Sequence, residues 1–172
     1  MSHSLYLRLI RAPKSSFFLF GMRGSGKSTW VERSGIPAQR IDILNEDLYQ
    51  KMLADSSLFS GMLEKARAWS WIFVDEVQRL PNLLNEVHRF IESKKLKFIL
   101  TGSSARKLKR GGTNLLGGRA LLKELHPLLP KELGSDFNLD DALANGTLPL
   151  IVTTTPEERK LRLKSYGQTY LK

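Results

Sequence analysis

Residues 17–29 read FFLFGMRGSGKST, and this stretch decides the fold. The four apolar residues Phe17–Phe20 are typical of a strand that is buried on both of its faces. The next eight residues satisfy the pattern G-x-x-x-x-G-K-[ST], and a short helix is predicted over residues 28–34. A buried strand, a glycine-rich turn and a helix in this order are the context that the pattern requires.

The glycine-rich turn is suited to bind phosphate groups. Its glycines allow successive backbone N–H groups to point inward, and the following helix adds partial positive charge. Lys27 can reach the β- and γ-phosphates of a nucleoside triphosphate, and the Ser28 hydroxyl can bind Mg²⁺. The alternative is a glycine turn with a purely structural role. The predicted cofactor-binding residues are Gly21, Met22, Arg23, Gly24, Ser25, Gly26, Lys27, Ser28 and Thr29.

Two acidic residues follow a second buried strand, because residues 71–76 read WIFVDE. Ligands bind at the carboxyl ends of parallel strands, which is where these acids would lie. Asp75 and Ser28 are therefore the predicted metal residues, and Asp75 holds the hydration shell of Mg²⁺. Glu76 is predicted to polarise water and is a catalytic residue together with Lys27. Without the glycine-rich turn, the same pattern would indicate only a strand that ends in a solvated turn.

Further polar residues are candidates whose alternatives stay open. Ser103, in the hydroxyl cluster Leu100-Thr101-Gly102-Ser103-Ser104, is predicted to be catalytic by bonding the γ-phosphate or the attacking water. The same cluster is also a good turn and helix N-cap. Arg119 is a catalytic candidate, in cis or from a neighbouring subunit, but a surface Arg at a strand edge explains it equally well. Gln78 either orients water or caps a backbone group.

The rest of the chain alternates predicted strands and helices. Strands are expected around residues 41–43, 71–74, 98–100 and 120–125. A helix is predicted over residues 46–68, with a break near residues 56–57, and another opens at Pro81. This alternation favours an α/β fold with a mostly parallel sheet covered on both faces. Near the end, residues 148–152 carry a buried-strand signal, and Thr155-Pro156 starts a helix.

Composition narrows the class of protein. The 172 residues hold 27 Lys and Arg against 17 Asp and Glu, and no Cys, which excludes disulfides, thiolate zinc sites and a Cys nucleophile. No signal-peptide core or membrane-spanning run is visible. We expect a cytoplasmic protein without a membrane partner. Residues 94–123 hold nine Lys or Arg and no acid. This predicts a polyanion partner, either nucleotide phosphates or nucleic acid, or equally a solvated basic face.

The motifs together resemble a family of prokaryotic AAA-type ATPases in which a P-loop domain precedes a C-terminal domain of unassigned function. The resemblance covers residues 5–172 and rests on GMRGSGKST, WIFVDEVQRLPNLLNEVHRFIE, KFILTGSSARKL, GGRALLKELHPL and NGTLPLIV in this order. Asn45-Glu46-Asp47 matches only part of the acid-rich stretch that many relatives carry, and no second Arg motif is identified.

The resemblance implies a three-layer AAA+ fold whose five-stranded sheet has the order 5-1-4-3-2, with ATP and Mg²⁺ as cofactors. It carries over roles for Lys27, Ser28, Asp75, Glu76 and Ser103. It also implies that the chain is a fragment that lacks the family's C-terminal domain. We expect residues 1–126 to form the P-loop nucleotide-binding core, and residues 127–172 a helical extension or partial lid.

The leading hypothesis is Mg²⁺-dependent ATP hydrolysis coupled to a conformational change of an unseen domain or partner, with a homo-oligomer as one arrangement. Two alternatives belong to other classes. A small-molecule phosphotransferase would use the same loop, and a nucleotide-gated DNA-binding module would use residues 94–123. Product analysis separates the first alternative, and salt-dependent binding to random duplex separates the second.

Overall fold

The computed structural model describes residues 6–110 and 116–170, which fall into two compact units. Unit 2 comprises residues 12–21 and 27–124, and unit 1 comprises residues 1–11, 22–26 and 125–172. The tip of the glycine-rich turn thus groups with the C-terminal part of the chain. A simple division at residue 126 stays a prediction.

Unit 2 is built on a five-stranded sheet with the order β2-β3-β4-β1-β5, in which every pairing is parallel. This is the expected order 5-1-4-3-2 read from the other edge, so the predicted α/β fold is confirmed. The strands are β1 (Phe17–Phe20), β2 (Ala38–Asp42), β3 (Trp71–Asp75), β4 (Lys97–Gly102) and β5 (Leu121–Glu124).

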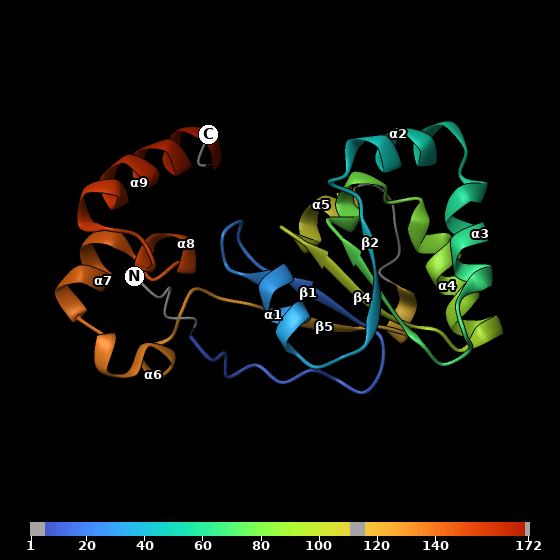
Figure 1. Cartoon of the computed structure of the whole chain (residues 1–172), viewed down its shortest axis with the longest axis horizontal. Coiled ribbons are helices and arrows are strands. Elements are labelled where there is room, and N and C mark those ends of the chain that lie inside the picture. The colour runs from blue at the N-terminus through green and yellow to red at the C-terminus, as the bar shows by residue number, and fades with distance from the viewer. Residues whose placement is uncertain (1–5, 111–115, 171–172) are drawn as a thin grey trace. The chain divides into compact units, whose positions relative to one another are not determined.

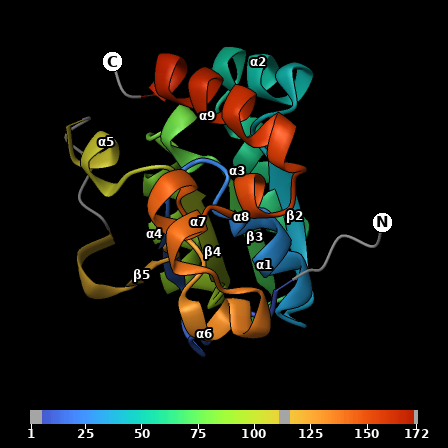
Figure 2. The same ribbon diagram turned by 90° about the vertical axis from the view of Figure 1, so that its left-hand side faces the viewer.

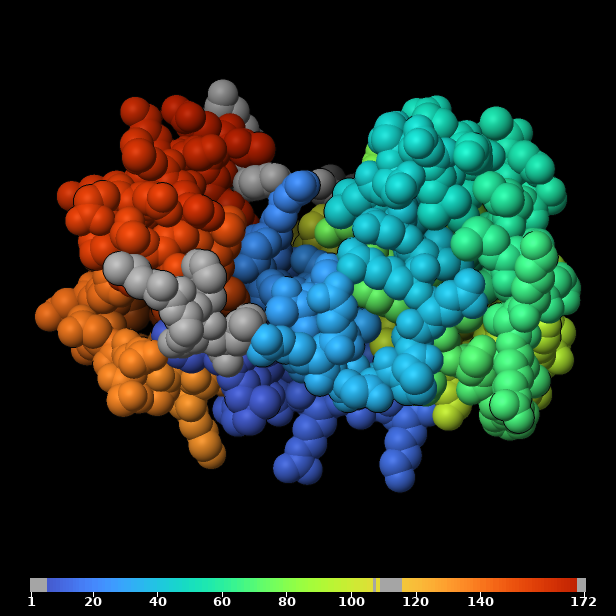
Figure 3. All heavy atoms as spheres, in the orientation of Figure 1, coloured from blue at the N-terminus to red at the C-terminus, as the bar shows by residue number. Residues whose placement is uncertain are grey.

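Helices cover both faces of this sheet (Figure 1). The helices of unit 2 are α1 (Lys27–Arg33), α2 (Glu46–Ala54), α3 (Ser57–Lys65), α4 (Leu83–Lys94) and α5 (Ala105–Arg110), with short 3₁₀ turns at η1 (Val77–Arg79) and η2 (Leu116–Gly118). The predicted break near residue 56 separates α2 from α3, where the Asp55 carboxylate accepts a 2.8 Å bond from Ser57 N. Side chains of α2 and α3 adjoin along one edge of unit 2 (Figure 3).

Alternation along the strands divides the core into two layers. On one face, Phe18 and Phe20 join a large apolar cluster with Phe59 of α3 and Phe90 of α4. On the other face, Phe17 meets Trp30 of α1 edge to face, with the ring centroids 6.2 Å apart. Burial on both faces explains why residues 17–20 contain no polar side chain.

Unit 1 contains α6 (Pro130–Leu133), η3 (Gly134–Asp136), α7 (Leu139–Asn145), α8 (Pro149–Val152) and α9 (Pro156–Tyr170). Both ribbon views show α7 and α8 beside the start of α9 (Figures 1 and 2). The strand signal at residues 148–152 is wrong, because this segment forms α8. Pro149 suits a first helical turn, and the Leu148 carbonyl accepts bonds from both Ile151 N and Val152 N. In the described ranges, no helix is long and apolar enough to cross a membrane.

The buried face of α3 provides a test of the core. Phe59 is fully buried, so Phe59→Ala should lower the free energy of unfolding by about 3–5 kcal/mol. Leu53 of α2 is 53% exposed, and Leu53→Ala should change it by less than about 0.5 kcal/mol. Chemical denaturation measures both. Equal losses in the two variants would contradict the packing described.

Candidate functional site

The register of β2, β3 and β4 places four polar residues of these strands on one face of the sheet. In this register Arg40 lies opposite Phe73, and Asp42 lies opposite Asp75. The pairing of Val74 with Leu100 places Thr101 next to Asp75 on the neighbouring strand. Because paired residues share a face, these polar side chains lie on the α1 side of the sheet.

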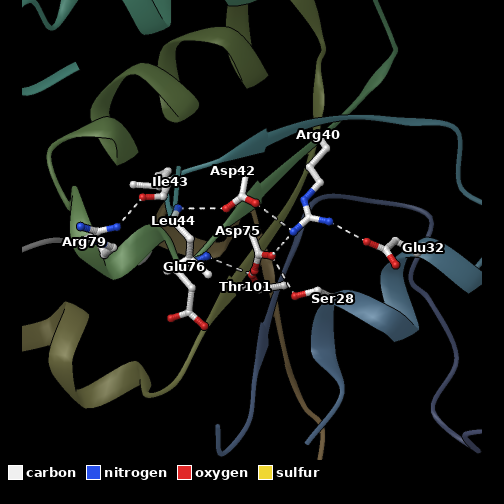
Figure 4. Close-up of polar contacts among 10 residues, drawn as sticks. All are labelled: Ser28, Glu32, Arg40, Asp42, Ile43, Leu44, Asp75, Glu76, Arg79 and Thr101. Carbon is white, nitrogen blue, oxygen red and sulfur yellow. Dashed lines mark hydrogen bonds and ion pairs between the residues drawn. The ribbon is translucent and has the colours of Figure 1, made fainter. Parts of the chain in front are cut away.

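The carboxylate of Asp75 is the centre of this group (Figure 4). Asp75 is 1% exposed. Its Oδ2 accepts hydrogen bonds from Ser28 Oγ at 2.8 Å and from Arg40 Nη2 at 3.0 Å, while Oδ1 accepts one from the Thr101 hydroxyl. Both oxygens of the buried carboxylate are therefore paired, as a charge in this position requires.

The start of α1 contributes the predicted residues Lys27 and Ser28. Lys27 is 6% exposed, and its Nζ donates a 2.8 Å bond to the carbonyl of Gly21, the first residue of the glycine-rich turn. The hydroxyl of Ser28 and the carboxylate of Asp75 are hard oxygen groups of the kind that Mg²⁺ prefers. Thr29, also predicted, is exposed on α1.

The tip of the glycine-rich turn, residues 22–26, belongs to unit 1. Gly24 and Gly26 have φ angles of 82° and 86°, which L side chains rarely adopt. Ser25 N donates to the Met22 carbonyl at 3.1 Å and closes the turn, while the side chains of Met22 and Arg23 are exposed. The Ser25 hydroxyl is buried and has no hydrogen-bond partner among the described residues. A buried donor without an acceptor fits a site for phosphate oxygens.

Other residues of unit 1 contact the same tip. Arg8 Nη1 donates to the Ser25 carbonyl at 2.9 Å, and Tyr166 of α9 donates to the Arg23 carbonyl at 3.1 Å. A Cβ on Gly24 would lie 3.1 Å from the Leu150 Cβ of α8. The tip is thus fixed by close packing as well as by its own turn.

Glu76 follows β3 with φ 56° and ψ 46°, a left-handed conformation that costs a non-glycine residue about 1–2 kcal/mol. Its backbone N–H donates to Thr101 Oγ1 at 3.2 Å, which helps hold this conformation. Its carboxylate accepts from Gln78 Nε2, and Figure 4 draws no hydrogen bond or ion pair from it to the other nine residues shown. Gln78 thus binds the Glu76 side chain. A Cβ on Gly102 would lie 2.6 Å from Gln78 Oε1, so a larger residue there would have to displace the Gln78 side chain.

Ser103 follows the carboxyl end of β4 and is half-buried. Gly21 N donates to the Gly102 carbonyl at 3.3 Å, so the first residue of the glycine-rich turn adjoins the strand end that precedes Ser103. The catalytic role of Ser103 stays a prediction.

Arg119 lies away from this group. It precedes β5, whose first residue Leu121 pairs with Phe17 at the amino end of β1, whereas Asp75 ends β3 at the carboxyl edge. Its guanidinium binds Glu92 of α4, and this hydrogen bond lowers the pKa of the Glu92 carboxyl. The fold does not bring Arg119 to Ser28 and Asp75, so its catalytic role stays a prediction for a neighbouring subunit.

Some basic residues of the stretch 94–123 form ion pairs with acidic residues outside it. Lys94 lies 3.9 Å from a Glu64 oxygen, and Arg119 pairs with Glu92. Arg106 is exposed. Residues 111–115 and the side chains of Lys107, Lys109 and Arg110 lie outside the described structure. Binding of nucleic acid by this stretch stays a prediction.

Two of the residues that bond to Asp75, Arg40 and Thr101, are not among the predicted site residues. The alternation of Arg40, Ile41 and Asp42 places Arg40 and Asp42 on one face of a strand, and this pattern could have paired them with the next acidic strand end. Thr101 belongs to the hydroxyl cluster in which Ser103 is the predicted residue. Thr101 directly follows the apolar run 98–100, as Asp75 follows the run 71–74. This shared position at a strand end favours Thr101 as the neighbour of Asp75.

A family model described as an AAA domain matches residues 13–134. The chain belongs to the AAA domain family. A search of curated proteins finds no match for it. Membership of this family supports nucleotide binding by the chain, with the loop and strand ends described above inside the matched residues.

Thr101 generates a prediction about stability. Thr101→Val removes the hydroxyl that pairs both with Asp75 and with the Glu76 N–H, and should lower the free energy of unfolding by about 1–3 kcal/mol. Thr101→Ser keeps the hydroxyl and should retain most of that stability. Denaturation curves of both variants decide the matter, and an equal loss in the Ser variant would show that the hydroxyl is not responsible.

Proposed function

We propose that the chain binds ATP with Mg²⁺ and hydrolyses it, and that hydrolysis changes the conformation of a further domain or partner. The observation that carries this proposal is the 2.8 Å hydrogen bond between Ser28 and the buried Asp75. Ser28 directly follows Lys27 in the sequence. A helix start that brings a cation and a hydroxyl to a strand-end carboxylate is suited to a metal–triphosphate complex.

Each predicted residue has a task in this proposal. The backbone N–H groups of residues 21–28 and the Lys27 ammonium bind the phosphate oxygens. Ser28 would hold Mg²⁺ and Asp75 its hydration shell, and the bound ion would supply charge that offsets the charge developing on the phosphate oxygens. In the described residues, no group of three or more His, Cys, Asp or Glu could hold a metal ion. Water and the nucleotide's phosphates would complete the coordination, as is usual for Mg²⁺.

Glu76 accepts a proton from the attacking water in this proposal, and Ser103 bonds the γ-phosphate or that water. Because Gln78 donates to the Glu76 carboxylate, it orients the base. The partner proposals are a homo-oligomer in the cytoplasm, in which Arg119 of a neighbouring subunit would reach the phosphates, and nucleic acid at residues 94–123.

Lys27 provides the test of nucleotide binding. Lys27→Ala removes the side-chain cation proposed for the β- and γ-phosphates, and should weaken ATP binding at least tenfold by calorimetry. Lys51 is exposed on α2, and Lys51→Ala serves as the matched control with unchanged affinity. An ATP affinity of Lys27→Ala within twofold of wild type would refute the phosphate-binding role of the loop.

Glu76 provides the test of hydrolysis. Glu76→Gln keeps size and hydrogen-bonding reach but cannot accept the proton, so it should retain ATP binding and slow hydrolysis by about 10²–10⁴-fold. Single-turnover phosphate release and filter-bound ATP are measured together, with Glu64→Gln as an exposed control. Equal release by wild type and Glu76→Gln would remove Glu76 from the mechanism. Transfer of phosphate to an added acceptor, without free phosphate, would indicate a phosphotransferase.

A further inference from the structure

Arg40 of β2 holds a position that the proposed function leaves unexplained. Its Nη2 lies 3.0 Å from Asp75 Oδ2 and 3.1 Å from Asp42 Oδ2, and its Nη1 lies 2.6 Å from Glu32 Oε1. One guanidinium therefore joins carboxylates from β3, β2 and α1 (Figure 4). The Asp75 oxygen that it contacts is the same one that accepts the Ser28 hydroxyl.

The three carboxylates differ in exposure. The Asp75 side chain is 2% exposed, whereas those of Asp42 and Glu32 are 36% and 55% exposed. A buried carboxylate without a counter-charge is costly, while exposed ones are hydrated. Arg40 thus matters most to Asp75, as the cation that neutralises it, and the other two acids offer the guanidinium alternative partners. The guanidinium also lies 5.5 Å from the centroid of the Phe73 ring.

A divalent cation at Ser28 and Asp75 would lie beside this guanidinium. An ion held there through its hydration shell and the guanidinium would both face the same carboxylate, and two cations this close repel each other. When the guanidinium leaves Asp75, Glu32 and Asp42 remain as its partners. The Arg40 guanidinium and a divalent cation are therefore alternative partners of the buried Asp75 carboxylate.

We propose that Arg40 is a positioning residue that competes with Mg²⁺ for Asp75, so that metal loading moves its guanidinium onto Glu32 and Asp42. This inference rests on the proposed function, because it takes Ser28 and Asp75 as the Mg²⁺ site. The competition sets the Mg²⁺ concentration at which the metal occupies the nucleotide site. Until that concentration is reached, Arg40 keeps Asp75 paired and buried.

The test is the Mg²⁺ concentration that half-saturates binding of a fluorescent, non-hydrolysable ATP analogue to the whole chain. Arg40→Gln should lower this concentration about three- to tenfold, because the competing charge is gone. Arg79→Gln is the matched control, since Arg79 pairs with Glu46 and the Ile43 carbonyl and does not contact Asp75; it should leave the value unchanged. Thermal unfolding in EDTA checks that each variant is folded.

A second variant tests the sharing of Arg40 between acids. Glu32→Gln removes the acceptor that draws the guanidinium away from Asp75, so it should raise the Mg²⁺ requirement at least twofold. In the Arg40→Gln background the same change should have no effect, since Glu32 acts through Arg40. A plain loss of negative charge near the metal would instead raise the requirement equally in both backgrounds.

The outcomes separate this inference from the proposed function. Wild type that binds no nucleotide at any Mg²⁺ concentration would overturn both. Wild type with Mg²⁺-dependent binding that Arg40→Gln leaves within twofold, or shifts upward, would overturn only the competition. If Arg40→Gln does not fold, Arg40→Lys replaces it, because a lysine lacks the fork that joins Asp75 to Glu32. Glu32→Gln should then raise the requirement less in the Arg40→Lys background than in wild type, and an equal rise in both would overturn the competition.

Discussion

Burying the carboxylate of Asp75 at the end of a parallel sheet requires hydrogen-bond donors for both of its oxygens, and the surrounding elements supply them. The register of β4 brings the Thr101 hydroxyl, the first turn of α1 brings Ser28, and β2 brings Arg40. Removing one of these donors leaves a buried charge partly unpaired and destabilises the fold. The strand order, the entry of α1 and the left-handed turn at Glu76 are thus tied to one charged group.

Much of the fold could be predicted because its strands are buried on both faces. Wholly apolar runs such as Phe17–Phe20 and residues 71–74 are distinctive, and glycine or acidic residues mark their ends. Short segments at the periphery were harder. Residues 148–152 are as apolar as a strand, yet Pro149 begins α8. In a run of five residues, hydrophobicity cannot separate a buried strand from a single helical turn, and the proline was the better signal.

In the candidate site, local sequence patterns could be predicted, whereas contacts between distant parts of the sequence could not. The phosphate-loop pattern and the acids at residues 75 and 76 are local, and the structure brings Ser28 to Asp75 within hydrogen-bonding distance. Arg40 is 35 residues from Asp75 in sequence, and their contact follows only from the register of two strands. For Arg119 the order along the chain is informative. A residue that precedes a parallel strand lies at its amino end, opposite the edge where Asp75 and Glu76 lie.

The carbonyl groups of the glycine-rich turn accept hydrogen bonds from other residues of unit 1. In a phosphate-binding turn the N–H groups face the ligand, so the carbonyls face the protein. Here the Ser25 carbonyl accepts from Arg8, and the Arg23 carbonyl accepts from Tyr166 of α9. Any rotation of these peptides that improves phosphate binding must change the bonds to Arg8 and Tyr166. Leu150, packed against Gly24, leaves little room for a compensating movement of the turn alone. The contacts within unit 1 therefore tie the conformation of the turn to α8 and α9.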